Sequence, residues 1–213
     1  MRKVLGAALM FFGAALLIGA LGLFLWNQKE AAQADQASMA VIPQLNEVIA
    51  RREEEREVRE ETLPDIQPGT PPELIPPEKK QMTEVEIDGY GYIGYLSIPS
   101  LGLELPVMAQ WDYPRLKIAP CRYSGTTMEE NLVVVAHNYR RHFGLLNQLH
   151  PGEEVLFTDM EGEILAYQVA AVDVVPPNSV EEVTAGIFDL ALVTCTYGGK
   201  TRVVVYCDEY IPE

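Results

Sequence analysis

The sequence predicts a mainly β protein: a closed or nearly closed β-barrel of about eight strands with short helices, preceded by a transmembrane helix and a stalk. Three observations lead to this prediction. A 23-residue run near the start of the chain contains no charged residue, a Pro-rich stretch occupies residues 64–77, and short apolar segments separated by turns follow from residue 82. The 213 residues suffice for one such domain with its appendages.

The uncharged run, residues 4–26, follows Arg2 and Lys3. A helix of this length spans roughly 34 Å at 1.5 Å per residue, enough to cross a bilayer core of about 30 Å. The preceding cations favour a cytoplasmic N-terminus, which would leave the rest of the chain outside the cell. Cleavage after the A-x-A sequence Ala32-Gln-Ala34 is the alternative, but a secretory h-region is usually only about 7 to 15 residues long. We therefore expect residues 1–26 to be a cytoplasmic tip and an uncleaved, single-pass anchor in the cell membrane.

Residues 27–81 are expected to form a helical and Pro-rich stalk. Apolar residues recur at helical spacing in 41–49, and a charged run follows over 51–61. A solvated stalk is preferred, because a coiled-coil contact requires more heptads. Six of the 14 residues in 64–77 are proline, which predicts an extended spacer of about 3.1 Å per residue. Such a spacer would hold the next domain tens of ångströms from the membrane.

The folded domain is expected over residues 82–213. Its strands alternate with turns such as 99–102 and 159–162, and its helices are limited to 144–149 and 179–183. The expected strands are 92–98, 103–107, 132–137, 154–158, 163–174, 189–194 and 202–207.

Three ionisable side chains stand at ends of these strands. Cys195 ends one strand, and Arg202 begins the next after a six-residue turn. If the two strands pair as a hairpin, both side chains face the same rim. His137 ends a third strand. Each residue alone has an ordinary explanation, since such a cysteine is usually a buried hydrophobe and an arginine usually a surface charge.

The distribution of charge favours a functional interpretation. From residue 82 onward there are only seven cations against 19 acids. Four of the seven are close in sequence to His137 or Cys195: Arg140, Arg141, Lys200 and Arg202. Positive potential near a thiol favours thiolate, the form that attacks carbonyl carbons. Without Arg2 and Lys3, the chain has 14 cations against 31 acids. This net negative charge argues against nucleic acid and anionic lipid as partners.

Two motifs make the domain resemble the sortases, cell-surface cysteine transpeptidases of Gram-positive bacteria. The family's T-L-x-T-C motif stands here as Ala191-Leu-Val-Thr-Cys195, with alanine in place of the first threonine. The family arginine corresponds to Arg202. The family histidine corresponds to His137 and precedes an F-x-x-L-x-x-L-x-x-G-[DE] pattern, present here as Phe143, Leu146, Leu149, Gly152 and Glu153.

The resemblance implies a sortase-like barrel that transfers an acyl group by means of Cys195, His137 and Arg202, with Thr194 and Ala191 beside the substrate. Its partners would be a sorting-signal peptide of surface proteins and an amine of a cell-wall precursor or of a pilin subunit. Anchoring of proteins to the wall is expected first and pilus assembly second. An exported cysteine hydrolase and a non-catalytic membrane-tethered adaptor are the rival interpretations.

The remaining polar residues are expected to be structural. His142 and His150 are interpreted as surface residues. Cys121 and Cys207 could form a disulfide, although two buried thiols are an equal alternative. Glu153 and Glu154 fit a solvated turn better than a calcium site, and no cofactor or metal is expected.

Overall fold

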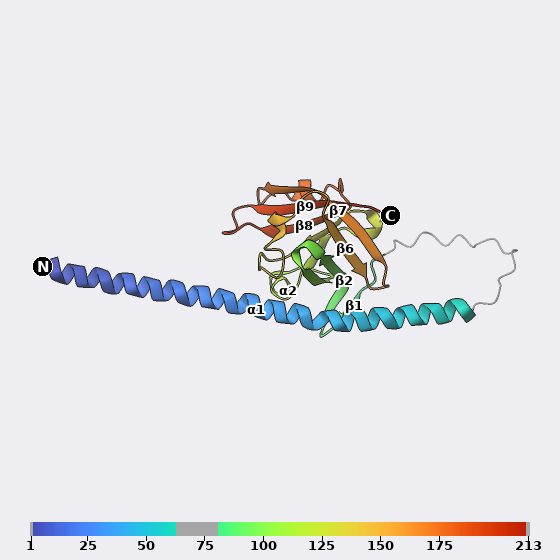
Figure 1. Ribbon diagram of the computed structural model, residues 1–213, viewed down its shortest axis with the longest axis horizontal. Helices are drawn as coiled ribbons and strands as arrows, with labels where there is room; N and C mark the ends of the chain where they lie inside the picture. The colour runs from blue at the N-terminus through green and yellow to red at the C-terminus, as the bar shows by residue number, and fades with distance from the viewer. Residues whose placement is uncertain (1, 63–80, 212–213) are drawn as a thin grey trace.

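The computed structural model of the chain describes residues 2–62 and 81–211, and shows a β-barrel lying alongside one long helix (Figure 1). The expected Pro-rich spacer, residues 64–77, lies outside the described residues. The strands are β1 (Val85–Ile87), β2 (Tyr90–Ile98), β3 (Leu103–Met108), β4 (Cys121–Ser124), β5 (Leu132–Val135), β6 (Glu154–Asp159), β7 (Ile164–Val175), β8 (Leu190–Cys195) and β9 (Arg202–Glu209). The helices are α1 (Arg2–Thr62), α2 (Tyr113–Leu116) and α3 (Val180–Val183), with three 3-10 turns, η1 (Pro99–Leu101), η2 (Thr127–Glu129) and η3 (Leu146–Gln148).

Eight of the strands close into a ring. Their order is β2-β3-β4-β5-β8-β9-β7-β6, and pairing of β6 with β2 completes the circle. The pairs β3–β4 and β5–β8 are parallel and the others antiparallel, while β1 extends the sheet as a hairpin with β2. Closure leaves the ring without free edges. The prediction of a closed, mainly β barrel is therefore confirmed.

The barrel interior is filled by residues that alternate inward along the strands. Leu96, Leu192 and Val205 have no exposed surface, and they belong to a cluster that spans both sides of the ring. Burial of each such side chain contributes roughly 1.5–3 kcal/mol. The apolar strand patterns in the sequence correspond to this core.

Two short strands, β1 and β4, were not predicted. Each has only three or four residues, and β4 contains a bulge between Arg122 and Ser124. Strands of this length carry too few alternations to be separated from loops. Strand β5 also ends at Val135, so His137 lies two residues beyond it instead of at its last position.

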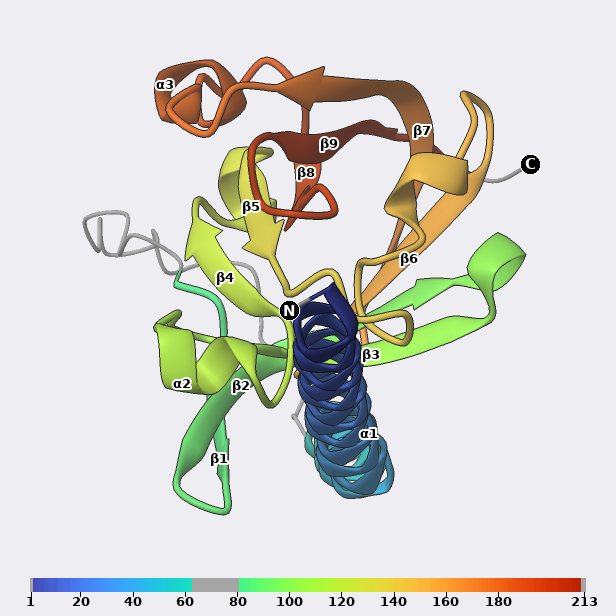
Figure 2. The ribbon, with the colours of Figure 1, turned by 90° about the vertical axis from the view of Figure 1, so that its left-hand side faces the viewer.

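The expected solvated stalk is wrong for the middle of α1. Val41, Leu45 and Ile49 are buried, and they cluster with Met108 and Tyr92 of the barrel. Figure 2, viewed along α1 from its N-terminal end, shows the helix running beside the barrel near β3. The apolar stripe has found a partner in the barrel's outer surface, whereas the charged run after residue 50 stays exposed.

This packing also corrects the expected separation between the barrel and the anchor. Lys117 Nζ lies 2.7 Å from Glu30 Oε1, and Arg141 Nε lies 3.4 Å from Asp35 Oδ2. Glu30 is four residues beyond the apolar run that ends at Trp26. The domain therefore contacts the helix immediately after that run, rather than standing tens of ångströms away.

Candidate active site

The strand register brings the three predicted residues to one end of the barrel. Cys195 is the direct partner of Arg202 across the β8–β9 hairpin, as the sequence predicted. Val135 and Val193 are partners in the parallel β5–β8 pair. Because His137 and Cys195 each follow these partners by two residues, both lie at the same level of the barrel end, Cys195 as the last residue of β8 and His137 two residues beyond β5.

A groove of about 300 Å³ opens at this end and is lined by Cys195, His137, Arg202 and Thr194 together. Apolar side chains make most of its remaining wall. They come from five segments: Trp111, Tyr113 and Leu116; Tyr123; Val133 and Val135; Val175, Pro176 and Pro177; Val180 and Val183. Such a groove suits an extended apolar peptide, with its polar groups concentrated at one place.

The turn after Cys195 fixes the position of Arg202. Its ends are held by the Thr196 amide donating to the Thr201 carbonyl at 3.0 Å, and by a 2.9 Å contact between the two hydroxyls. Arg202 Nη1 donates to the carbonyls of Gly199 and Thr201, at 3.1 and 3.0 Å. A guanidinium has five N–H donors, so others remain for a ligand in the groove.

Thr194 is buried and acts as a structural link beneath the groove. Its hydroxyl donates to the Ala136 carbonyl at 2.9 Å. The bond joins the residue before Cys195 to the residue before His137. Thr194 therefore sets the spacing between the two segments that carry the candidate thiol and imidazole.

His137 is half-buried beside Tyr139, with 5.0 Å between the ring centroids. Burial lowers the pKa of His137, while the nearby Glu30 carboxylate partly raises it and Lys117 lowers it. The neutral imidazole is thus the main form at pH 7, and the two charges from outside the groove tune its protonation in opposite directions.

The expectation that His142 is a surface residue is wrong. It has no exposed surface, and its ring lies 5.5 Å from that of Tyr139. Burial and the neighbouring His137 lower its pKa to about 4, with a partial offset from the Ala34 backbone, although neither ring nitrogen makes a hydrogen bond of normal geometry to a described residue. Its polar loop is covered by α1, a tertiary contact that the local sequence did not indicate. His150, in contrast, is exposed as expected.

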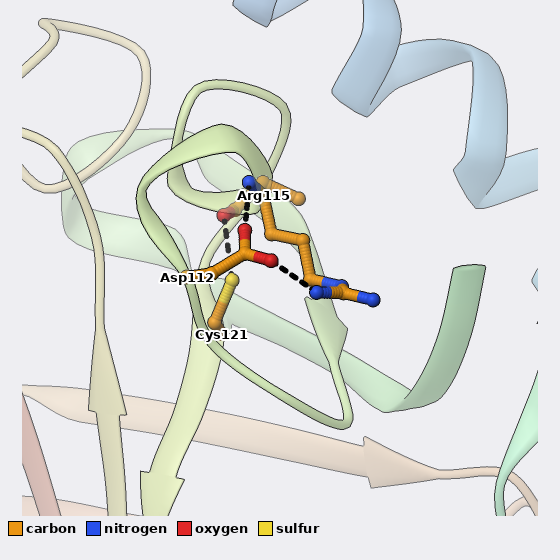
Figure 3. A network of polar contacts seen from close by, with 4 residues as sticks. Asp112, Arg115 and Cys121 are labelled. Atoms are coloured by element: carbon orange, nitrogen blue, oxygen red, sulfur yellow. Dashed lines mark hydrogen bonds and ion pairs between the residues drawn. The ribbon is translucent and has the colours of Figure 1, made fainter.

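An aromatic rim on one side of the groove was also missed. Trp111 lies 6.2 Å from Tyr113 and 5.3 Å from Tyr123, measured between ring centroids. Asp112 holds this loop in place by capping α2 through the Arg115 amide at 2.6 Å and by pairing with the Arg115 guanidinium, above the buried Cys121 (Figure 3). The signal available in the sequence was the run Trp111-Asp-Tyr-Pro114, in which two aromatic residues flank a helix-capping aspartate.

The other candidates lie away from the groove. Ala191 is buried in an apolar cluster with Val133 and Tyr206, and the structure does not bring it to the groove wall. Cys121 and Cys207 are free, buried thiols in separate clusters, and burial raises the pKa of each to about 12. They do not form a disulfide.

Glu153 accepts a hydrogen bond from the His150 amide at 2.6 Å, as a turn residue does. The part of the chain that the structure describes contains no group of three His, Cys, Asp or Glu side chains able to hold a metal ion.

Comparison with known proteins places this fold and this strand arrangement in one family. A family model for the sortase domain matches residues 96–210, more than half of the chain. The chain belongs to the sortase family. No curated protein sequence matches it.

Solved structures of sortases are similar to this chain. Sortase C1 from Streptococcus suis is 27% identical over 57% of this chain and 74% of that one, with a TM-score of 0.51. Sortase C from Streptococcus pneumoniae is 27% identical over 57% and 70%, with a TM-score of 0.50. Sortase C1 from Streptococcus agalactiae, at 21% identity, covers 83% of this chain and 100% of its own with a TM-score of 0.57, and supports the fold. Membership of the family identifies the chain as an enzyme of the transpeptidase class.

Proposed function

We propose that this sortase uses Cys195 to cleave an LPXTG-like sorting signal between Thr and Gly and to transfer the acyl group to an amine of a cell-wall precursor. The observation that carries the proposal is the convergence of Cys195, His137 and Arg202 on one peptide-sized groove. Three ionisable side chains from two separate parts of the barrel meet there, while most of the wall is apolar.

In the first half of the reaction, the Cys195 thiolate attacks the threonine carbonyl carbon and the carbonyl π electrons move to oxygen. Arg202, held by the turn carbonyls, donates hydrogen bonds to that oxyanion or to the substrate backbone. When the C–N bond breaks, protonated His137 gives its proton to the departing glycine amine. A thioester between Cys195 and the threonine acyl group results.

The second half reverses these roles. The incoming amine attacks the thioester carbon, its proton passes to the neutral His137, and the C–S bond breaks to release the Cys195 thiolate. Water in place of the amine would give hydrolysis. The low pKa of His137 means that neutral imidazole is abundant for this half, while the protonated form limits the first half.

Pilus assembly is the second candidate, because the similar sortase C from Streptococcus pneumoniae has pilin substrate specificity. In that case the acceptor would be an amine on another protein subunit. The same groove, thiol and imidazole would serve both reactions, and only the source of the amine differs.

We also propose that residues 4–26 anchor the chain in the cell membrane, with the N-terminus in the cytoplasm and the barrel outside. The first helix includes an apolar window of mean hydropathy 2.3, none of it buried against the barrel. Cleavage after Ala34 is disfavoured because Ala34 is 2% exposed within a continuous helix, and Asp35 pairs with Arg141. A peptidase would have to separate the helix from the barrel to reach that bond.

Incubation of the purified enzyme with a library of LPXTG-like peptides, with and without amine nucleophiles, tests the reaction. Mass spectrometry should detect a peptide cut after threonine and joined to the added amine, and Cys195→Ala should give neither product. Release of free acid alone, at the same rate with amine present, would identify a hydrolase. A wall-derived amine and a lysine-bearing pilin peptide, supplied in competition, distinguish wall anchoring from pilus assembly.

A further inference from the structure

Three contacts of α1 show which parts of the barrel lie near the apolar run and which lie far from it. Glu30 touches Lys117, Asp35 touches Arg141, and Glu53 lies beside Gly162 in the β6–β7 turn. At 1.5 Å per residue, these contacts lie roughly 6, 14 and 40 Å beyond Trp26, where the apolar run ends. The groove end of the barrel is therefore nearest to the apolar run, and the β6–β7 turn is far from it.

The domain's charges are separated along the same direction. All seven cations after residue 81 lie in the segments that surround the groove end: Arg115, Lys117, Arg122, Arg140, Arg141, Lys200 and Arg202. The opposite ends of strands β5, β8 and β9 carry Glu130, Asp189 and Glu209. Burial, followed by repulsion from Asp189 and Glu130, raises the pKa of Glu209. Net negative charge disfavours binding to anionic lipid for the chain as a whole, but this arrangement presents a basic end to one side.

Part of the basic end is already neutralised. Three of its cations form ion pairs: Lys117 with Glu30, Arg141 with Asp35, and Arg115 with Asp112. Two acidic residues, Glu181 and Glu182, lie on α3, which Figure 2 shows at the side away from α1. Arg140 and Lys200 are exposed, and neither forms an ion pair with any residue within 2–62 or 81–211. These two cations are free to contact an external anion.

An aromatic side chain stands next to one of them. Tyr197 is fully exposed in the β8–β9 turn, three residues before Lys200 and beside two glycines with positive φ. Figure 1 shows this turn reaching from the barrel toward the end from which the N-terminal half of α1 extends. An exposed tyrosine beside a lysine matches the composition of segments that lie at a membrane–water interface.

Resting on the proposed anchor, we propose that the groove end of the barrel docks on the outer surface of the same membrane, with Arg140 and Lys200 against anionic lipid headgroups and Tyr197 among them. The headgroup layer adds roughly 5–8 Å beyond the hydrocarbon on each side. The Glu30–Lys117 contact lies at that depth, and attraction to anionic headgroups acts within a Debye length of about 8 Å. Docking places the groove at the height where a membrane-bound polypeptide leaves the bilayer.

Fluorescence quenching by brominated lipids tests the docking on the full chain in nanodiscs. Trp26→Phe and Trp111→Phe remove the native tryptophans, and Tyr197→Trp then reports the turn, with Ile164→Trp as the matched control beside the far β6–β7 turn. In discs that contain phosphatidylglycerol, the tryptophan at 197 should lose most of its fluorescence and the one at 164 almost none. Quenching of the tryptophan at 197 should be relieved in discs of phosphatidylcholine alone and in 1 M salt. The double variant Arg140→Gln, Lys200→Gln should relieve it as well.

The outcomes separate the docking from the proposals on which it rests. The docking would be overturned if the tryptophans at 197 and 164 were quenched equally. It would also be overturned if quenching of the tryptophan at 197 were the same with and without phosphatidylglycerol. A chain that keeps only Trp26 reports the anchor: if Trp26 escapes quenching, the anchor is wrong and the docking falls with it. The readout needs no turnover, so adding Cys195→Ala should leave every result unchanged and keeps this test independent of the proposed reaction.

Discussion

Glu30 of α1 and Lys117, at the C-terminal end of α2, form an ion pair 2.7 Å apart and shift the pKa of His137 in opposite directions. The carboxylate raises the pKa of the imidazole and the ammonium lowers it. Neither residue lines the groove within the described structure. The segment next to the proposed anchor is thereby coupled to the protonation of a residue proposed to transfer a proton.

The first prediction concerns this pair. Glu30→Gln should lower the pKa of His137 further, because the carboxylate that favours the charged imidazole is lost. The rate of thioester formation near pH 7 should then fall by about 2- to 5-fold, and its decline should begin at lower pH. Lys117→Gln is the matched control and should shift the profile the other way. A pH–rate profile for acylation with both variants measures this, and parallel shifts in the two would refute the coupling.

The second prediction concerns the three thiols. Cys195→Ala should abolish the thioester without unfolding the protein, because Cys195 is at the groove surface rather than in a core cluster. Cys121→Ala and Cys207→Ala should keep turnover and cost about 1 kcal/mol of stability each, since both are buried.

Alkylation checks the same assignment without substrate. Mild iodoacetamide should modify Cys195 alone, because burial raises the pKa of Cys121 and Cys207 to about 12 and shields both sulfurs. Peptide mapping reads the result. An unreactive Cys195 would favour a non-catalytic adaptor.

The third prediction concerns topology. Protease added to intact cells should remove the barrel by cutting beyond α1, and the protein should fractionate with membranes. The expected fragment retains residues 1–62, because the helix and its contacts protect the preceding chain. Immunoblotting with an N-terminal tag measures this. A mature chain that starts at Asp35 in the medium would instead identify Ala32-Gln-Ala34 as a cleavage site.

The strands and the hairpin at the site were predictable because their determinants are local. Short apolar runs bounded by turn residues mark β2, β7 and β9, and the short turn between Cys195 and Arg202 permits only one simple pairing. The resemblance to the family's T-C motif then indicated which end of the barrel would carry the chemistry.

The packing of α1 could not be predicted in the same way. Its apolar stripe around Leu45 was visible, but the surface that covers it comes from β2, β3 and the loop near α2, which lie far from Leu45 in the sequence. The burial of His142 follows from that packing, since the charged Arg140 and Arg141 before it indicate a surface loop. Local periodicity cannot predict a feature that depends on contact between two segments that are distant in the sequence.

The fourth prediction concerns His142 and acid stability. Its folded-state pKa is about 4, below the ordinary 6.5, so the unfolded chain binds the proton more readily. The neutral ring therefore contributes on the order of 2–3 kcal/mol to the free energy of unfolding. This contribution is fully present above pH 6.5 and is lost as pH falls toward 4. Denaturant unfolding of the full chain in micelles, at several pH values between 4 and 7, should show a smaller loss for His142→Leu than for the natural chain. If the difference in unfolding free energy between His142→Leu and the natural chain stays the same from pH 7 to pH 4, the ring is not buried as described.

The last prediction separates Arg202 from the cations around it. Arg202 is the direct partner of Cys195, and its Nη1 is held by two turn carbonyls. Arg202→Lys keeps the charge but loses the planar set of donors, so it cannot hold the turn and reach the oxyanion at the same time. The value of kcat/KM should fall by roughly 10- to 1000-fold, the range expected when an oxyanion donor is misplaced.

Lys200→Ala and Arg140→Ala serve as the comparison, because both side chains are exposed and neither lines the groove. On a soluble sorting peptide at fixed salt, each should reduce kcat/KM only mildly, through weaker steering of the substrate. Thermal unfolding of all three variants excludes a general loss of structure. If Lys200→Ala reduces kcat/KM more than Arg202→Lys does, then Lys200 rather than Arg202 supplies the donor, and the turn must rearrange when the peptide binds.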